Sequence, residues 1–420
     1  MNTPIVPLVG ASAFALLGAY HWSRAKDLVD PAVAISTTWC VTILVIALFG
    51  NTLYGISWHA LAIFALGIAS FSLGAILGNR IPLNVKPTTT FTYQNDRSIL
   101  LMALFILLAG IPFYLSYVLQ FTNAPLFSPR YFTDIRAAML IQTSTTVHRS
   151  AFVNNLVVLA TISAVIAYAL SRHLQRWPLL AIGIIALAFF YNLLTAAKTG
   201  VINLAVMLFA IDALQRDRIQ KRALILVLLA VLALFGIITV MRAQAGVDTT
   251  LSPLEMAKAA LSQLGYYLVA GPVGFSVYLK NPHLVAPVWD PWLFFERTAN
   301  YFGNFFHIPD LNAAYVHIGH DLNYNVYTAF FSYYPPYGPA GVAAFMLAIG
   351  LIAGLTYKLA RQQHLIWQVL YAAIFYGVVM SVFAEELLLA LNPILKLLLV
   401  AILVDGVRRI RFRKTFSHVA

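Results

Sequence analysis

The feature that most constrains this chain is a succession of apolar stretches, each about long enough to cross a lipid bilayer as a helix. About 20 mostly apolar residues are needed, because the hydrocarbon layer is about 30 Å thick and an α-helix rises about 1.5 Å per residue. The chain is therefore predicted to be an all-α polytopic membrane protein with about 11 transmembrane helices, which form one integral membrane domain over residues 1–420. The eleven stretches are 4–20, 31–49, 58–77, 99–121, 151–171, 178–195, 201–214, 223–241, 338–357, 366–383 and 387–404.

The composition excludes the main alternatives to a membrane protein. Hydrophobic residues make up 61% of the chain and charged residues 10%, with a mean hydropathy of +0.80. A soluble domain is about 45–50% apolar and about 25% charged, so a soluble enzyme and a disordered chain are both excluded. Cys40 is the single cysteine, which excludes an internal disulfide and a cysteine metal cage. The net charge of +12 is interpreted through membrane topology, and no nucleic-acid partner is expected.

The positions of Lys and Arg in the connections predict the orientation, because cytoplasmic loops carry an excess of both residues. Eighteen of the 27 cations fall in one set of alternate connections and eight in the other set, while Lys396 lies inside the last stretch. The N-terminus is therefore predicted to lie outside the cytoplasm and the basic tail, 405–420, inside it. The stretch 4–20 lacks the basic start of a signal peptide, so we expect it to remain as a helix.

Two of the predicted outer connections, 122–150 and 242–337, are long, whereas the other connections are short. Long loops in a compact domain are commonly functional. The second loop contains a semi-apolar stretch, 264–279, that is interrupted by Gly271-Pro272. This pattern predicts an interfacial or re-entrant helix pair on the outer leaflet. We therefore expect a large and partly helical outer loop.

Cations on the outer side oppose the positive-inside bias and so call for a functional explanation. Arginine offers a planar fork for phosphate oxygens and lysine a point charge, so together they suit an anionic ligand such as a pyrophosphate. In the alternative interpretation each side chain snorkels or pairs locally, Arg136 with Asp134 and Arg297 with Glu296. The candidate cations are Arg130, Arg136, Lys198, Arg242 and Arg297.

Acid–base candidates are few on the predicted outer face. His317 and His320, in the sequence HIGHD with Asp321, stand just before the ninth stretch. Their spacing of three places both histidines near one face of a helix, an arrangement that can bind a metal. No further ligand follows at close spacing, so no metal site and no cofactor are predicted.

A second acidic feature is the pair Glu385-Glu386 at the end of the tenth stretch. We interpret it as half of an internal ion pair with Lys396, about ten residues further along. The chain has no P-loop, no dinucleotide-binding glycine motif, no HExxH and no GxSxG, so nucleotide use and serine hydrolysis lack support.

Several short motifs then occur together in one order. The segment NVYTAFFSYYPPYGPAGVAAF combines an Asn-x-x-Thr motif, Asn325 and Thr328, with an aromatic run and a Gly-x-x-Gly helix start. This resembles a segment of the Wzy-type oligosaccharide repeat-unit (O-antigen) polymerases. Three further pieces follow the order of that family: Arg136 in APLFSPRYFTDIR, Lys198 in TAAKTGVINLAV, and Arg242 at the start of the large outer loop. The chain departs from the family in having lysine where arginine is usual in the short link, and Pro336 in place of an aspartate before the Gly-x-x-Gly.

The resemblance implies a membrane glycosyltransferase of the GT-C superfamily in the bacterial inner membrane. Such a polymerase works on the periplasmic face and takes a glycan from one undecaprenyl-pyrophosphate carrier. It transfers that glycan to the repeat unit on a second carrier and releases undecaprenyl pyrophosphate. The implied partners are the lipid-linked donor and acceptor, the lipid bilayer and a chain-length regulator.

The resemblance also suggests roles for the candidate residues. Arg136, Lys198 and Arg242, supported by Arg130 and Arg297, would hold the pyrophosphate and stabilise its growing charge without a metal ion. His320, or else Asp321, would take the proton of the acceptor hydroxyl. The remaining candidates for substrate binding are His317, Asn325, Tyr327 and Thr328. Asn325 and Thr328 also fit a simple role in fixing the turn before the helix.

Two other functions remain open at this point. A flippase or anion transporter for polyprenyl-linked glycans would use outward cations equally well, although internal repeats and titratable groups at mid-membrane would be expected. An O-antigen ligase would share the chemistry and differ in its acceptor.

Overall fold

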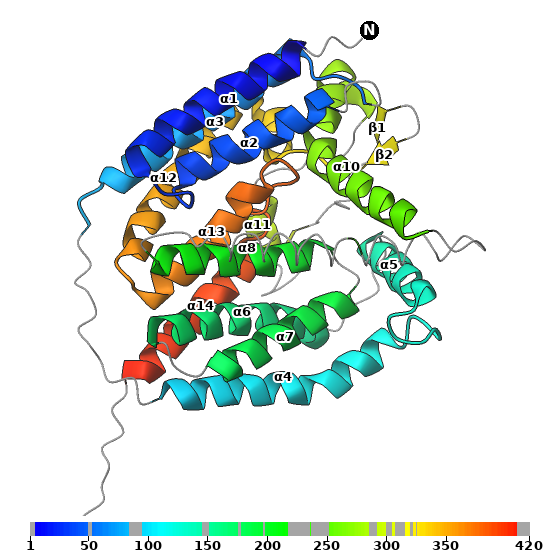
Figure 1. Cartoon of the computed structure of the whole chain (residues 1–420), viewed down its shortest axis with the longest axis vertical. Helices are drawn as coiled ribbons and strands as arrows, with labels where there is room; N and C mark the ends of the chain where they lie inside the picture. The colour runs from blue at the N-terminus through cyan, green and yellow to red at the C-terminus, as the bar shows by residue number, and fades with distance from the viewer. Residues whose placement is uncertain are drawn as a thin grey trace, which may run out of the picture.

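The protein is described from a computed structural model, and almost all described elements are helices (Figure 1). The described residues are 5–48, 53–83, 95–144, 151–174, 178–195, 198–216, 236, 252–284, 292–299, 305–306, 316–319, 322–324 and 326–409. The α-helices are α1 (Ile5–Ala25), α2 (Pro31–Leu48), α3 (Trp58–Arg80), α4 (Asp96–Val118), α5 (Pro129–Ser144), α6 (Ala151–Leu174), α7 (Pro178–Leu194), α8 (Lys198–Gln215), α10 (Pro253–Lys280), α11 (Leu293–Ala299), α12 (Tyr334–Arg361), α13 (Leu365–Met380) and α14 (Leu391–Arg409). The other elements are the 3₁₀ turns η1 (Pro282–Leu284) and η2 (Ala329–Ser332) and the antiparallel strands β1 (Val316–Gly319) and β2 (Leu322–Tyr324).

The all-α membrane class predicted from the sequence agrees with these elements. Ten of the eleven predicted stretches coincide with helices, and the other, 223–241, lies outside the described residues apart from Gly236. Within the described residues, five helices are long and apolar enough to cross a membrane: α1, α2, α3, α4 and α12. Four shorter apolar helices accompany them, in α6, α7, α8 and α13.

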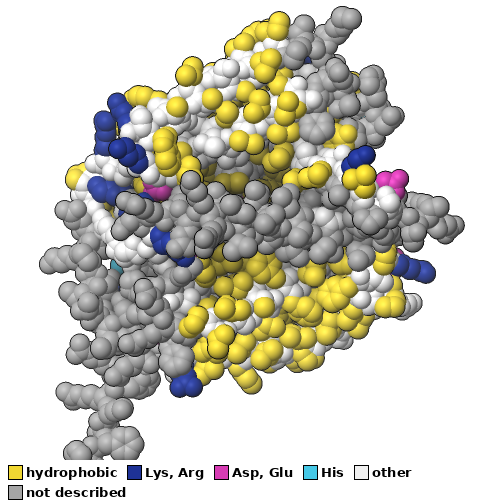
Figure 2. All heavy atoms as spheres, viewed as in Figure 1, with side chains coloured by type: hydrophobic (Ala, Val, Ile, Leu, Met, Phe, Trp, Pro, Cys, Tyr) yellow, Lys and Arg dark blue, Asp and Glu magenta, His cyan; other side chains and the backbone are white. Residues whose placement is uncertain are grey.

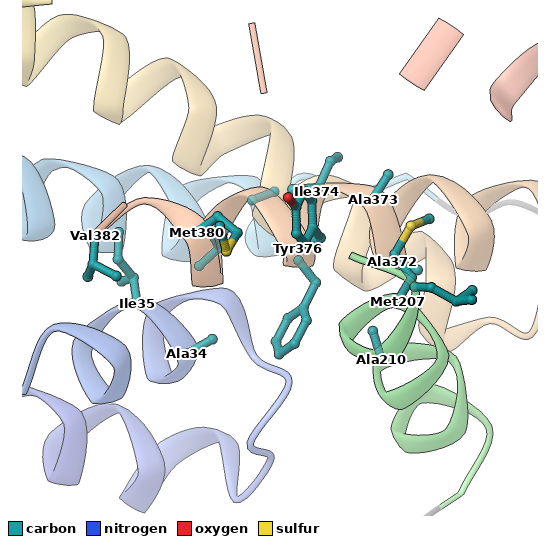
Figure 3. Packing of buried hydrophobic residues seen from close by; sticks show 14 of the residues in the cluster. Ala34, Ile35, Met207, Ala210, Ala372, Ala373, Ile374, Tyr376, Met380 and Val382 are labelled. Carbon is teal, nitrogen blue, oxygen red and sulfur yellow. The ribbon is translucent and has the colours of Figure 1, made fainter. Parts of the chain in front are cut away.

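The helices form two groups with α13 between them (Figure 1). The first group contains α1, α2, α3 and α12, with α10 against it, and the second contains α4, α6, α7, α8 and α14. Figure 3 shows Met207 and Ala210 of α8 near one end of α13, by Ala372 and Ala373. Ala34 and Ile35 of α2 lie near its other end, by Met380 and Val382. Because both groups pack on α13, most of its residues are buried, and it forms the centre of the hydrophobic core.

The closest helix crossing joins α3 and α12 through glycines. Gly74 and Gly78 of α3 face the α12 backbone, and Gly350 and Gly354 of α12 face the α3 backbone in return. A Cβ atom at Gly74 would lie 2.1 Å from the carbonyl oxygen of Leu347, so any side chain there would push the helices apart. Small residues spaced four apart allow such close backbone approach, which membrane helices need because lipid removes the hydrophobic drive for association.

Local sequence signals set the helix starts. The side chain of Ser57 accepts a hydrogen bond from the backbone N–H of Ala60 at 3.1 Å, which caps α3. Asp30 caps α2 in the same way through backbone N–H groups of its first turn. In α12 the chain bends at Gly338, whose φ of 62° is unfavourable for a residue with a side chain.

The two ends of the helix bundle differ in charge. We call the end that carries the described cations Arg24, Arg80, Arg361 and Arg408 the basic end, and the opposite end, with α5, α10 and the β-hairpin, the loop end. Figure 2 shows Lys and Arg side chains gathered toward the basic end, on the left of the view, and hydrophobic side chains over the flank. This charge asymmetry is the structural counterpart of the bias seen in the sequence.

Ion pairs connect the helices at the basic end. Arg408 Nε of α14 lies 2.8 Å from Asp96 Oδ1 of α4, and both side chains are almost fully buried. The guanidinium of Arg361 pairs with Asp27, which also accepts a hydrogen bond from the Tyr357 hydroxyl at 2.6 Å. Two further pairs lie within single helices: Asp212 with Arg216 and Asp405 with Arg409.

Two local expectations from the sequence are wrong. The stretch 264–279 is not a helix pair, because α10 runs without interruption through Pro272 and is one helix of 28 residues. The histidine-containing sequence HIGHD does not start a helix either. His317 lies on β1, which pairs with β2 in a short antiparallel hairpin, so His317 is not on the face of a helix.

Candidate functional site

The predicted pyrophosphate-binding cations fall on several elements of the loop end. Arg130 is exposed on α5, and its Nε lies 3.9 Å from Asp134 Oδ2. Arg136 lies on the same helix, Lys198 is the first residue of α8, and Arg297 lies on α11, but their side chains are outside the described parts. Arg242 lies outside the described residues altogether. The pairing expected between Arg136 and Asp134 lies outside the described side chains, and Asp134 accepts the Thr122 hydroxyl at 2.7 Å.

A tyrosine that the sequence analysis did not single out ties α5 to the neighbouring helices. The hydroxyl of Tyr131 donates to the carbonyl oxygen of Leu194 at 2.8 Å, and the Tyr131 side chain is fully buried. Leu194 is the last residue of α7, and the chain reaches Lys198 four residues later. The helix that carries Arg130 and Arg136 is therefore fixed beside the link that leads to Lys198 (Figure 1).

An open hollow of about 720 Å³ lies where α4 passes into α5. It brings the Arg130 guanidinium together with Asp134, the Thr122 hydroxyl and backbone of the connecting loop. Its lining residues are Gln120, Phe121, Thr122, Asn123, Ala124, Pro125, Ser128, Pro129, Arg130 and Asp134. The mixture of one cation, one carboxylate and several neutral polar groups makes this a polar surface of the loop end.

Of the predicted acid–base region, the structure describes His317, which is exposed on β1 and pairs in register with Asn323. His320 and Asp321 lie outside the described residues. Within the described parts of the chain, no group of three His, Cys, Asp or Glu side chains is placed to hold a metal ion.

The Asn-x-x-Thr segment leads into η2 and α12. Asn325 is outside the described residues, while Tyr327 and Thr328 are buried, with 4% and 1% of their surface exposed. The Tyr327 ring stacks on Phe331 with centroids 4.3 Å apart. Thr328 precedes the first turn of η2, but its side chain makes no capping hydrogen bond. These two side chains contribute to packing at the loop end.

The connection between α13 and α14, residues 381–390, is the most unusual segment of the loop end. Glu385 is 5% exposed, and its carboxylate accepts hydrogen bonds from the backbone N–H groups of Leu387, Leu388 and Leu389 at 2.9, 2.9 and 2.6 Å. These N–H groups belong to the turn that precedes α14, whose first residue is Leu391, so the carboxylate holds the turn that leads into that helix. Glu385 therefore stabilises the conformation of this connection.

Three other elements hold the same connection. The indole N–H of Trp39 in α2 donates to the hydroxyl of Ser381 at 3.0 Å. The backbone carbonyl of Ser381 accepts from the N–H of Ala329 in η2 at 2.8 Å, and Tyr267 of α10 stacks on Phe383 with centroids 5.2 Å apart. The connection is therefore fixed from several sides.

Next to Glu385, the side chain of Glu386 enters a pocket of about 230 Å³ that we call the loop-end pocket. It lies between α6, α7, α8, α13 and α14, at the halves of these helices nearer the loop end. Its walls are mainly aliphatic, and the polar side chains among them are Thr161, Asn192, Asn203, Tyr376 and Glu386.

The amide side chains of this pocket are held in place. Asn192 Nδ2 donates to the Ala188 carbonyl at 2.8 Å and to the Thr161 hydroxyl at 3.3 Å. Gly200 makes room for this arrangement, because a Cβ there would lie 2.1 Å from Asn192 Oδ1. The buried Oδ1 atom of Asn203 has no hydrogen-bond partner among the described residues. An acceptor without a donor in a pocket is a place where a ligand hydroxyl can bind.

The two adjacent carboxyl groups have different environments. Burial and, to a smaller extent, the neighbouring Glu385 carboxylate together raise the pKa of Glu386 to about 7. Burial also raises the pKa of Glu385, but its three backbone N–H donors act in the opposite direction. The ion pair expected with Lys396 is not the contact observed, because the Lys396 ammonium donates to Asn155 Oδ1 at 2.7 Å. One carboxyl is thus used for folding, and the other faces a pocket.

The pair Glu385-Glu386 is a sequence signal for this site, but amino-acid composition does not assign a role to either residue. Two consecutive glutamates between apolar stretches are costly at membrane depth, and such residues usually have a function. Their separate roles depend on which backbone N–H groups reach Glu385, and only the folded connection specifies this.

Comparison with protein-family models, curated proteins and solved structures finds no match for this chain.

Proposed function

We propose that this protein is a membrane glycosyltransferase that polymerises undecaprenyl-pyrophosphate-linked oligosaccharide repeat units on the periplasmic face of the bacterial inner membrane. The product would be O-antigen or a related surface polysaccharide, with undecaprenyl pyrophosphate released at each step. The observation that carries the proposal is the hydrogen bond between Tyr131 and Leu194. It supports a cluster of cations at the loop end, because it holds the helix with Arg130 and Arg136 beside the link to Lys198.

In this proposal the basic end is cytoplasmic and the loop end periplasmic, with the N-terminus periplasmic and the C-terminus cytoplasmic. The gathering of cations at the basic end supports this orientation. The loop end would then present α5, α10 and the hairpin to the periplasm, where the lipid-linked glycans are displayed. The apolar flank of the bundle would contact the polyprenyl chains and the lipid bilayer.

The pyrophosphate of the donor is a good leaving group, so stabilising its negative charge should dominate the chemistry. Arg136, Lys198 and Arg242 would supply that charge, with Arg130 and Arg297 at the edge. Fixed cations can act in place of a divalent metal because they need no reorganisation during the reaction.

The second candidate is a transporter for polyprenyl-linked glycans or other anions, and the Glu386 carboxyl favours it. A titratable side chain in a pocket between membrane helices is a common feature of proton-coupled transport. An O-antigen ligase is the third candidate, since it would differ from a polymerase only in the acceptor it uses.

The experiment that separates these functions is deletion of the gene followed by gel analysis of the surface polysaccharide. A polymerase predicts loss of the ladder with a single repeat unit retained on the core. A bare core would contradict the polymerase and indicate a ligase or a flippase.

Complementation then tests the cation cluster. Lys198→Ala and Arg242→Ala should each reduce polymerisation about 10²–10³-fold, with the double variant little worse, if both residues stabilise one pyrophosphate. Lys258→Ala, on the exposed part of α10, is the matched control and should complement fully. Normal polymer from Lys198→Ala at normal expression would remove the proposed pyrophosphate role.

A further inference from the structure

We infer that the loop-end pocket binds the terminal sugar of the acceptor glycan and that Glu386 is the catalytic residue that accepts the proton of its attacking hydroxyl. This inference rests on the proposed glycosyltransferase function and names the acceptor site within it. It replaces His320 and Asp321 as candidates for the base.

The dimensions of the pocket suit one sugar ring. Its volume of about 230 Å³ is smaller than the roughly 300–1,000 Å³ of pockets that hold drug-sized ligands. An oligosaccharide would therefore have only its end inside the pocket, with the rest of the chain at the loop end. This is the geometry that a reaction at a terminal sugar requires.

The polar side chains suit hydroxyl groups, which both donate and accept hydrogen bonds. Asn203 Oδ1 offers an acceptor that no described protein group uses, and the carboxylate of Glu386 offers another. Thr161 and Tyr376 add hydroxyls, and Asn192 is oriented by its own bonds to Ala188 and Thr161. A sugar hydroxyl that donates to Asn203 would remove the energetic penalty of leaving a buried acceptor unpaired.

The contrast between the two neighbouring glutamates identifies which one takes the proton. Glu385 is committed to three backbone N–H groups, so protonating it would weaken the turn that precedes α14. Glu386 lines the pocket and makes no ion pair with any described residue. Pairs of carboxyl groups whose environments separate their proton affinities commonly divide structural and acid–base roles in this way.

The position of the pocket relates it to the donor. Gly200 lines the pocket and lies two residues after Lys198, the first residue of α8. An acceptor sugar in the pocket would thus lie under the start of the helix where a donor pyrophosphate is proposed to bind. Both reactants would meet at one helix terminus.

The proposed step is balanced in atoms and charge. The acceptor hydroxyl transfers its proton to the Glu386 carboxylate while its oxygen forms a bond to C1 of the donor glycan. The bond between C1 and the pyrophosphate oxygen breaks, and its electron pair leaves with undecaprenyl pyrophosphate. Glu386 then returns its proton to water before the next turnover.

The test uses the full-length protein in lipid vesicles, with polyprenyl-pyrophosphate-linked glycan extracted from membranes of the deletion strain as the probe. Glu386→Gln should reduce the rate of polymerisation about 10²–10⁴-fold, because a positioned base contributes a factor of this size. Glu386→Asp should restore part of the rate, since it keeps a carboxylate. The matched control is Glu255→Gln, at the exposed start of α10, which should polymerise normally.

Four outcomes are separable. If the wild-type protein makes no polymer from this probe, the proposed function fails. If the wild-type protein polymerises and Glu386→Gln does so at the same rate, the function stands and the assignment of the base is overturned. A slow Glu386→Gln with an unchanged melting temperature and a rate that no longer varies between pH 5 and 8 supports the base. A slow Glu386→Gln whose rate keeps the wild-type pH profile would assign the carboxylate to positioning and also overturn it.

Discussion

The basic end and the loop end treat buried acidic side chains in opposite ways. The described chain buries four aspartates, Asp27, Asp96, Asp212 and Asp405, and each of them pairs with an arginine at the basic end. At the loop end, Glu385 is equally buried but is bonded to backbone N–H groups, and Glu386 faces a pocket. The basic end thus neutralises its buried carboxylates with arginines, whereas the Glu386 carboxyl group at the loop end faces a pocket and has no ion pair with a described residue.

This difference indicates that the basic end is optimised for stability and the loop end for function. A buried ion pair joins helices from distant parts of the chain, and removing one partner leaves an uncompensated charge. A carboxyl group in an apolar pocket without a cation is unfavourable for folding, so its presence points to function. The two ends can therefore be distinguished by variants that remove one charge at a time.

The largest effect is expected at the pair that joins α14 to α4. Arg408→Ala should lower the free energy of unfolding by about 3–5 kcal/mol, because Asp96 would remain buried without its partner. The measurement is chemical or thermal unfolding of the purified protein in detergent. The double variant Asp96→Ala with Arg408→Ala should be more stable than Arg408→Ala alone.

The control for this prediction is Arg130→Ala at the loop end. Arg130 is 84% exposed and lies 3.9 Å from Asp134, so its removal should change the free energy by less than about 1 kcal/mol. Equal effects of Arg130→Ala and Arg408→Ala would contradict the comparison of the two ends.

A smaller effect is expected from the pH dependence of stability at the loop end. The pKa of Glu386 is raised from 4.5 to about 7 in the folded protein, so its contribution to stability is full below about pH 4.5 and is lost as the pH rises through 7. The loss amounts to at most about 3.5 kcal/mol, at about 1.4 kcal/mol for each unit of pKa. The melting temperature should therefore fall between pH 5 and 8, and Glu386→Gln should fall less steeply.

The other titratable groups around Glu386 are present in both the wild-type protein and Glu386→Gln. Their contributions therefore cancel when the pH slopes of the two proteins are compared. These groups are Glu385 in the same connection, Tyr333 beside it, Tyr376 of α13, Lys396 of α14, which donates to Asn155, and Lys198 at the start of α8. Identical pH slopes for the two proteins would show that Glu386 does not titrate in this range.

The smallest effect is expected from removing one tyrosine hydroxyl at each end of the helix bundle. Tyr131→Phe at the loop end and Tyr371→Phe at the basic end each remove a hydrogen bond to a backbone carbonyl, Leu194 and Val29 respectively. Both should lower the free energy of unfolding by about 1 kcal/mol. Only Tyr131→Phe should also slow polymerisation, since it loosens the helix that carries Arg130 and Arg136. A similar loss of polymer in both variants would attribute the effect to stability alone.

The sequence predicted most of the secondary structure because membrane helices must satisfy their own backbone hydrogen bonds over a fixed length. It was less reliable where short segments depend on their neighbours. The sequence HIGHD was interpreted as helical, yet its described residues, 317–319, lie in strand β1, where Tyr54 donates its N–H to the Ile318 carbonyl at 2.7 Å. Likewise, Gly271-Pro272 was taken to interrupt a helix, but α10 continues through it with its second half buried against the first group.

The candidate site likewise has residues that the sequence identified and a contact that only the structure shows. Arg130 and Arg136 on one segment and Lys198 on another were identified from their residue types and from the orientation that the charges imply. The Tyr131 hydrogen bond that joins α5 to the end of α7 was not, because the local sequence around a tyrosine carries no signal for a carbonyl 63 residues away.

The sequence by itself determined that this chain forms apolar helices and that its cations gather at one end, since both depend on composition over stretches of about 20 residues. Only the tertiary structure decided which charges pair: Arg408 meets Asp96 across 312 residues, and Lys396 bonds to Asn155 instead of to a glutamate. It also decided that Glu385 binds backbone N–H groups of the turn before α14 while Glu386 lines the loop-end pocket. The physical reason is that hydrophobicity adds along the chain, whereas a hydrogen bond or ion pair requires two atoms to meet at about 3 Å.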